Sequence, residues 1–177
     1  ALSRGNQVAT APRSVPLIPM PEVLPTLPTL SEHLTRGLCC AALNGGLGSV
    51  LVFDLQPDQL PVVADAFAQM IAVARGEKVT RVVLNSVESE DRLWGSFGLS
   101  TRDAHTPLVW QPGLLSPSTK EDGIRLVIIP DLDRVGSTVA RALVAMVGVE
   151  VAQIERYGRQ QQWRPKFYWL AGCPGNA

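Results

Sequence analysis

Four short apolar runs, separated by helical patterns, most constrain what this chain can fold into. The runs lie at residues 49–53, 79–84, 124–129 and 167–171, and most of their residues are aliphatic or aromatic. Continuous apolar runs of this length fit strands that are buried on both faces, as in a parallel sheet. The order of strands and helices predicts an α/β fold of three layers, in which a parallel sheet carries helices on both faces.

A β-hairpin insertion is predicted at residues 150–163. Its turn falls at Tyr157-Gly158, between two stretches of mixed polar and apolar residues. The stretch 85–123 reads as irregular, apart from a short apolar piece at 108–110. We therefore expect one hairpin outside the parallel sheet.

Residues 1–29 read as a proline-rich extended arm, and residues 30–177 as the folded core. Proline cannot donate to a ladder of backbone hydrogen bonds, and runs of it favour extended polyproline geometry. The core begins with a helix at 29–43, where Thr29 and Glu32 match a capping box. The arm is either a flexible leader or a strap that binds the core or a partner through its apolar residues, which are Val15, Leu17, Ile18, Met20, Val23 and Leu24.

Composition excludes several classes of protein. The chain has 177 residues, 46% of them hydrophobic, which suits one folded domain. Sixteen basic and sixteen acidic residues give no net charge, so we expect no recruitment of nucleic acid. No uninterrupted apolar run approaches the roughly 20 residues that a membrane helix needs, so we also expect no membrane span. The three cysteines form no disulfide framework, and we expect reduced, buried thiols. Because residues 1–29 lack the apolar core of a signal peptide, we expect a cytoplasmic protein, or a stromal one in a plastid.

The segment between the first strand and the following helix is where a phosphate-binding loop would lie. Such a loop has the pattern GxxxxGK[ST], with glycine amides around the phosphates and a lysine that binds their charge. Residues 54–61 of this chain contain no glycine and no lysine, and they include the carboxylates of Asp54 and Asp58. We therefore expect neither ATP hydrolysis nor tight binding of MgATP, and we expect no cofactor.

Five motifs occur in a characteristic order along the chain: ALNGGLGSVL (42–51), EDRLWGSFGL (90–99), QPGLL (111–115), IIPDLDR (128–134) and VAQIERYGR (151–159). Together they resemble the magnesium chelatase/MoxR branch of AAA+ ATPases, over residues 30–174. The resemblance implies an AAA+ P-loop-like core, here without the helical lid. It also places the phosphate-binding lysine at Leu60, the magnesium-binding Ser/Thr at Pro61, the Walker B Asp-Glu pair at Pro130-Asp131, and the sensor asparagine at Cys173.

These departures are similar to those of a magnesium chelatase D-type subunit, whose AAA+ domain is often degenerate. The resemblance implies a catalytically inactive structural or regulatory subunit. Its partner would be an I-type AAA+ ATPase of magnesium chelatase, or further copies of itself. The complex would insert Mg²⁺ into protoporphyrin IX, a step in the biosynthesis of chlorophyll or bacteriochlorophyll. No catalysis is expected from this chain alone. Two alternatives stay open: an inactive adaptor of another MoxR-type system, and an ATPase with an unorthodox phosphate loop.

The sequence offers no catalytic residues and no convincing metal ligands. Asp54, Asp131 and Asp133 could meet at the carboxyl ends of parallel strands and bind Mg²⁺. We favour helix capping for Asp131 and Asp133, because both precede the helix predicted at 136–147. His33 and His105 have no metal-binding spacing around them, and we expect ordinary surface histidines.

Interaction with a partner is the predicted role of the hairpin and its surroundings. Arginine and aromatic side chains are the types enriched at binding hot spots. In the family that the chain resembles, hairpins near this strand face the ring pore or a neighbouring subunit. A second prediction concerns the strand at 49–53, which would be an uncovered sheet edge and a place for association. The interface candidates are Arg92, Trp94, Arg156, Tyr157, Arg159, Trp163 and Arg164.

Overall fold

The computed structural model describes residues 30–44, 49–53, 58–86, 88–99, 108–117 and 123–173. Its helices are α1 (Glu32–Leu43), α2 (Leu60–Arg75), α3 (Glu90–Trp94) and α4 (Ser137–Val144), with a 3₁₀ turn η1 (Leu132–Arg134). Its strands are β1 (Ser49–Phe53), β2 (Val79–Val83), β3 (Gly95–Leu99), β4 (Leu108–Pro112), β5 (Ile124–Ile129), β6 (Ala152–Arg156), β7 (Arg159–Trp163) and β8 (Phe167–Cys173). Residues 1–29, to which the predicted arm belongs, lie outside the described part.

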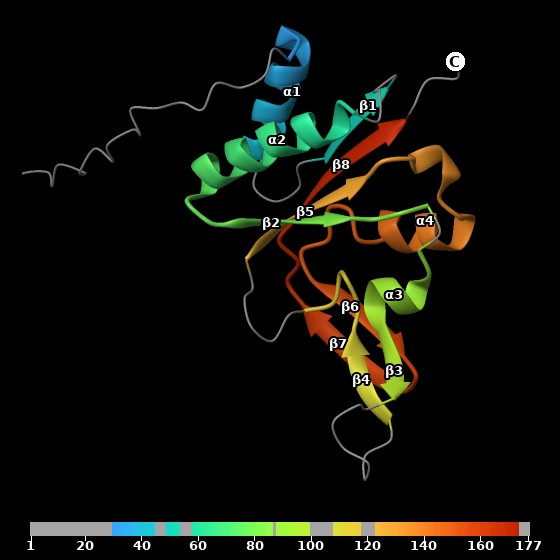
Figure 1. The fold of residues 1–177 in the computed structure, drawn as a ribbon. Helices are drawn as coiled ribbons and strands as arrows, with labels where there is room; N and C mark the ends of the chain where they lie inside the picture. Colours follow the sequence, from blue (N-terminus) through green and yellow to red (C-terminus); the bar gives the residue numbers. More distant parts are fainter. Residues whose placement is uncertain are drawn as a thin grey trace, which may run out of the picture.

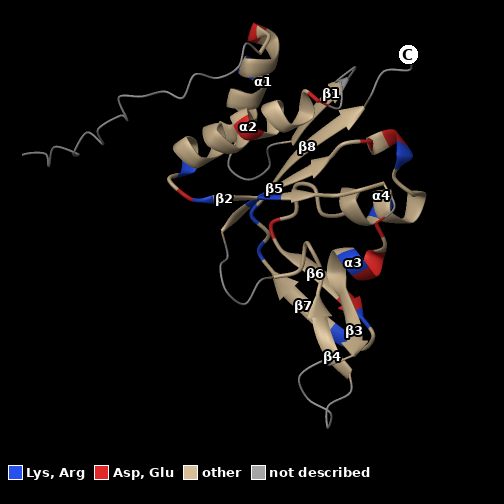
Figure 2. Cartoon of the chain, viewed as in Figure 1, with Lys and Arg blue, Asp and Glu red and all other residues tan. Residues whose placement is uncertain are grey.

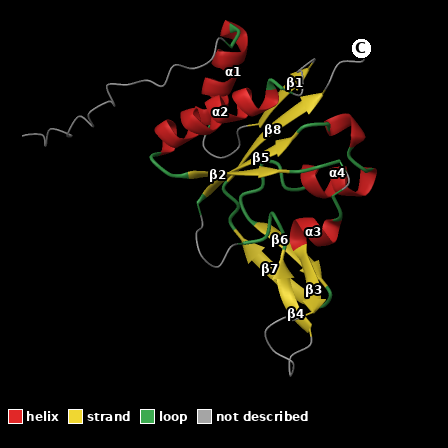
Figure 3. Cartoon of the chain, viewed as in Figure 1, coloured by secondary structure: helices red, strands yellow, loops and turns green. Residues whose placement is uncertain are grey.

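A parallel, open sheet of four strands forms the centre of the molecule, in the order β1-β8-β5-β2 (Figures 1 and 3). Strand β8 lies between β1 and β5 and is parallel to both. The predicted parallel sheet is therefore confirmed. Among the described strands, β1 has no neighbour on its outer side, so it is an edge of this sheet, as expected.

Two apolar cores, one on each face of the sheet, make the fold three-layered. Alternate side chains of a strand point to opposite faces. On β5 and β8, Leu126 and Tyr168 lie in a core with α1 and α2. Their neighbours Val127 and Trp169 lie in a second core with α3 and α4. Because all four side chains are buried, the sheet is covered on both faces, which explains why its central strands are apolar throughout.

Two antiparallel hairpins extend from one end of the sheet (Figure 3). The hairpin β6–β7 was predicted, and its turn residues Tyr157 and Gly158 have φ of 52° and 74°. The hairpin β3–β4 was not, and the prediction of an irregular stretch there was wrong. Gly95 begins β3 immediately after α3 and has a φ of 102°, which only glycine adopts readily.

Hydrogen bonds hold the base of the hairpin β3–β4 on the core. The backbone N–H groups of Leu114 and Leu115 donate to the carbonyls of Arg92 and Leu93 in α3, both at 2.9 Å. Arg125 of β5 donates to the carbonyl of Ser116 at 2.7 Å. These bonds join the chain after β4 to α3, which leads into β3, and to β5, so the base of the hairpin is fixed.

Two local predictions require correction. The cap of α1 is Ser31, whose hydroxyl accepts a hydrogen bond from the N–H of Leu34 at 3.3 Å, and not Thr29, which lies outside the described residues. Cys39 and Cys40 are exposed, because α1 turns Leu38 and Ala42 toward the sheet and its other side faces outward. The expectation of buried thiols was therefore wrong for these two cysteines. No helix in the described part of the chain combines the length and apolar character that crossing a membrane requires.

Candidate functional site

The carboxyl-terminal edge of the parallel sheet brings together three of the positions assigned to a nucleotide site. Cys173 is the last residue of β8 and pairs with Phe53, the last residue of β1. Pro130 and Asp131 directly follow β5. Gly172 lies so close to this turn that a Cβ built on it would be 2.8 Å from the carbonyl oxygen of Pro130. The ends of β1, β5 and β8 therefore meet at one edge, where open α/β sheets bind ligands.

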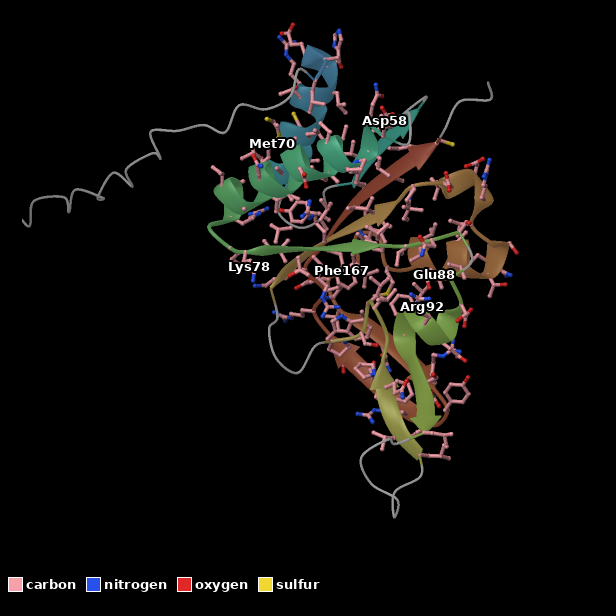
Figure 4. All side chains as sticks on the ribbon, viewed as in Figure 1. Asp58, Met70, Lys78, Glu88, Arg92 and Phe167 are labelled. Carbon is pink, nitrogen blue, oxygen red and sulfur yellow. The ribbon has the colours of Figure 1, made fainter. Side chains whose placement is uncertain are left out.

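Leu60 and Pro61 lie in the first turn of α2, which begins beside the end of β1 (Figure 1). Leu60 is 8% exposed and belongs to the core between α2 and the sheet, whereas Pro61 is exposed. Asp58 precedes this turn and carries an exposed carboxylate (Figure 4). Residues 54–57, including Asp54, lie outside the described part of the chain.

Metal binding at this edge receives no support from the described residues. Asp131 precedes η1 and makes no side-chain capping bond, and the carboxylate of Asp133 is exposed. Within the described ranges, no three His, Cys, Asp or Glu side chains come close enough to hold a metal ion. His33 is exposed on α1, and His105 lies outside these ranges.

The second candidate site is a cluster that joins the two hairpins to α3. The guanidinium of Arg156, at the end of β6, donates to the carboxylates of Glu90 and Asp91 in the first turn of α3. The bond to Asp91 is 2.5 Å long, and the hydroxyl of Tyr157 donates to the same carboxylate at 2.8 Å. The side chain of Arg156 is 19% exposed. In Figure 2, α3 itself carries acidic and basic positions side by side.

The electrostatics of Arg156 follow from these contacts. Burial alone would lower the pKa of its guanidinium, because burial penalises the charged form. Hydrogen bonds with Glu90, Tyr157 and Asp91, and the charge of Asp91, outweigh that effect and raise the pKa above its ordinary value. Arg156 is therefore a permanent cation that holds two carboxylates together.

Aromatic side chains continue this cluster across the two hairpins. The ring of Phe97 on β3 lies between Trp110 on β4, with ring centroids 5.4 Å apart, and Tyr157, at 6.4 Å. Arg159 on β7 places its guanidinium 5.1 Å from the centre of the Trp110 ring. Edge-to-face rings and cation–π pairs each add specific attraction to the apolar contact. The two hairpins therefore pack on each other, although they belong to separate sheets.

An apolar surface beyond this contact remains uncovered. Leu99 and Leu108 are cross-strand partners on β3 and β4, and they are 73% and 58% exposed. Phe97 and Tyr157, next to them, are about half exposed. We call Phe97, Leu99, Leu108 and Tyr157 the hairpin patch. Arg159 lies at its border, and no carboxylate of the described residues is within ion-pair distance of Arg159.

The backbone of Tyr157 is itself unusual. A φ of 52° is rare for a bulky residue other than glycine. This conformation belongs to the two-residue turn and sets the ring against Phe97 and Arg156. A two-residue hairpin turn of this kind requires a positive φ at both of its central residues, so the turn itself accounts for the conformation of Tyr157.

The structure separates the predicted interface candidates into groups. Arg156, Tyr157 and Arg159 come together at the cluster, as described. Trp94 is 4% exposed and lies in the core under α4, so its place does not fit an interface residue, and Trp163 packs partly buried against the same core. Arg92 lies 3.0 Å from the buried carboxylate of Glu88 (Figure 4), and Arg164 lies near the amino-terminal ends of β5 and β8.

Several residues of this cluster were not predicted to belong to a functional site. Glu90 and Asp91 were noticed only as part of a motif, and Phe97 and Trp110 were placed in an irregular stretch. The available signal was the alternation of larger and smaller residues in 95–99, which pairs Phe97 and Leu99 on one face of a strand.

Comparison with known proteins supports the fold. No protein-family model and no curated protein matches the sequence. Among solved structures, the chain is similar to a cryo-EM-based structure of the complex between subunits BchI and BchD of magnesium chelatase, with 18% identity and a TM-score of 0.56 over 81% of this chain and 52% of that one. It is also similar to a presumed ATPase from Cytophaga hutchinsonii, with 13% identity and a TM-score of 0.50 over 80% of this chain and 37% of that one.

At these identities the similarity concerns the fold alone. The chain shares an open, three-layered α/β core with these two structures, and it spans about half of the chelatase chain it matches and less of the Cytophaga protein.

Proposed function

We propose that this chain is a catalytically inactive AAA+-like module that serves as an assembly platform for an active AAA+ ATPase, as part of a magnesium chelatase. The first support is the likeness in fold to a complex of two chelatase subunits. The second is the order of motifs along the chain, with the nucleotide-site positions altered. The structural similarity concerns the fold alone, so the role in Mg²⁺ insertion is part of what we propose.

The surroundings of Leu60 are the main support for the proposed lack of catalytic activity. If Leu60 stands where a phosphate-binding lysine is needed, the side chain offers no charge and lies in the core. Pro61 follows it and has no N–H to donate to a phosphate. The carboxylate of Asp58, just before this turn, would repel an anionic ligand. Each change weakens phosphate binding independently, so restoring one residue alone is not expected to restore it.

The hairpin patch is the surface through which the partner would bind. Its exposed apolar side chains are bordered by the guanidinium of Arg159, which stacks on Trp110 and makes no ion pair with a described residue, and tyrosine and arginine are frequent hot-spot residues. The cluster of Arg156 fixes both hairpins before binding, so association would lose little conformational freedom. A partner surface with an apolar side chain beside a carboxylate would fit.

Co-migration with an I-type magnesium chelatase ATPase on a sizing column, with and without MgATP, tests the proposal. We expect a ring-sized complex that depends on MgATP, while labelled ATP binds the ATPase but not this chain alone. Tight binding of ATP by this chain alone would contradict its inactivity. Failure to associate under both conditions would contradict the chelatase role.

A second candidate is an adaptor for a different AAA+ ATPase, without a role in magnesium insertion. The likeness to the Cytophaga protein, a presumed ATPase, supports it. The two candidates differ in partner, and the same column experiment distinguishes them. Association with a MoxR-type ATPase, together with no association with the chelatase subunit, would favour the adaptor.

A further inference from the structure

An apolar cavity of about 460 Å³ lies where the hairpins meet the core. Helix α3, the end of α4 with the turn after it, and strand β6 form its walls. Its size falls in the range of sites that bind ligands. The apolar part of its lining includes Trp94, Ala142, Met146, Val149, Ala152 and Ile154.

The end of this cavity nearest the hairpins carries charge. Glu90, Glu155 and Arg156 line it. Arg156 already binds the carboxylates of both Glu90 and Asp91. Glu155 is exposed, and it makes no ion pair within the described part of the chain. The cavity therefore combines an apolar floor with an end of net negative charge, and it suits a segment in which a basic residue adjoins apolar side chains.

The chain itself contains a segment of that kind. Residues 13–20 read Arg-Ser-Val-Pro-Leu-Ile-Pro-Met, with Arg13 followed by four apolar side chains and two prolines. In polyproline geometry, residues three apart lie on the same side, which pairs Val15 with Ile18 and Leu17 with Met20. Proline restricts the backbone conformations open to a free segment, so a proline-rich segment would lose little conformational entropy on binding.

We propose that residues 13–20 occupy this cavity, with Arg13 at Glu155 and the apolar side chains against α4 and β6. Nine residues separate Met20 from Leu30, where the described chain begins, and nine extended residues span about 30 Å. The segment comes from the same molecule or from a neighbouring copy, and this inference does not depend on the proposed function.

Swapping the two charges, in the chain of 177 residues, tests the proposed contact between Arg13 and Glu155. Hydrogen exchange of residues 142–156 reports occupancy of the cavity. We expect Arg13→Glu and Glu155→Arg each to raise exchange there about three- to fivefold, and the double variant to return it toward wild type. Arg4→Glu and Glu150→Lys are matched controls, since neither residue belongs to the proposed contact, and they should leave exchange unchanged.

A double variant of the arm, Leu17→Asp with Ile18→Asp, tests the apolar part without altering the core. We expect exchange in residues 142–156 to rise more than tenfold, because two buried apolar side chains are lost. Sedimentation over a concentration series then identifies the donor: a monomer means that the segment is intramolecular, and a dimer that this double variant dissociates means exchange between copies. Unchanged exchange in this variant would overturn the proposal, as would failure of the double charge variant to recover.

Discussion

The guanidinium of Arg156 donates a hydrogen bond to the carboxylate of Glu90, which precedes it by 66 residues in the chain. This contact, with the bond to Asp91, links the end of β6 to the start of α3. Because α3 continues directly into β3, one arginine sets the position of both hairpins.

Replacing Arg156 by alanine should destabilise the protein by about 1–2 kcal/mol, because two charge-assisted hydrogen bonds are lost from partly buried positions. Glu90→Gln should cost about 0.5–1 kcal/mol, since Glu90 is 35% exposed. Chemical unfolding of both variants and their double mutant measures the coupling. Strict additivity would show that the two side chains do not interact in solution.

The stabilisation from Arg156 should be constant between pH 7 and pH 10. The folded-state pKa of Arg156 is raised, so its contribution is fully present below the unfolded pKa and is lost only as pH rises through the folded pKa. Unfolding free energies of wild type and Arg156→Ala, measured at both pH values, should differ by the same amount. A difference that shrinks by more than about half would mean that another group controls the contact.

Leu99→Asp should weaken association with the partner ATPase by at least about tenfold while leaving the melting temperature nearly unchanged. Leu99 is 73% exposed and contributes little to the core, but it lies in the hairpin patch. Val73→Asp is the matched control, since Val73 is equally exposed on α2. Binding assays compare the affinities of wild type, Leu99→Asp and Val73→Asp for the ATPase. Equal affinities would exclude the hairpin patch as the contact surface.

Two glycine substitutions should change stability in opposite directions. Gly172→Ala should destabilise by about 1–3 kcal/mol, because its Cβ would lie 2.8 Å from the carbonyl oxygen of Pro130. Gly37→Ala, in α1, should stabilise by about 0.5–1 kcal/mol, since the added Cβ would meet no described residue beyond its own stretch of helix and alanine favours the helix. Thermal melting compares them. Equal melting temperatures would show that β8 can move away from the turn after β5.

The central sheet could be predicted from the sequence because its strands are buried on both faces. The strand predicted at 124–129 is β5, with the same bounds, and its apolar residues leave no alternative to burial. The hairpin β3–β4 could not be predicted in this way. Its first strand contains Gly95 and Gly98, its second ends at Pro112, and four of the five residues of the second strand are exposed, so the apolar signal is weak.

The sequence predicted which types of residue form the candidate site, but not which of these residues contact one another. Arg156, Tyr157 and Arg159 stood out because arginine and aromatic side chains are the types enriched at binding hot spots. Trp94 carried the same signal, yet it is buried. The pairing of Arg156 with Glu90 depends on how α3 packs beneath β6, and no local pattern in either segment contains that information.

The short connection between β7 and β8 couples the hairpin mechanically to the central sheet. Only residues 164–166 separate the hairpin from β8, whose seven residues extend about 23 Å between two hydrogen-bonded neighbours. Phe167 at one end lies in the core beside the hairpins, and Cys173 at the other reaches the carboxyl-terminal edge of the sheet. A force that a partner applied to the hairpin tip would therefore pass through a connection of only three residues into the middle strand of the sheet, and β8 would bear it in tension or shear.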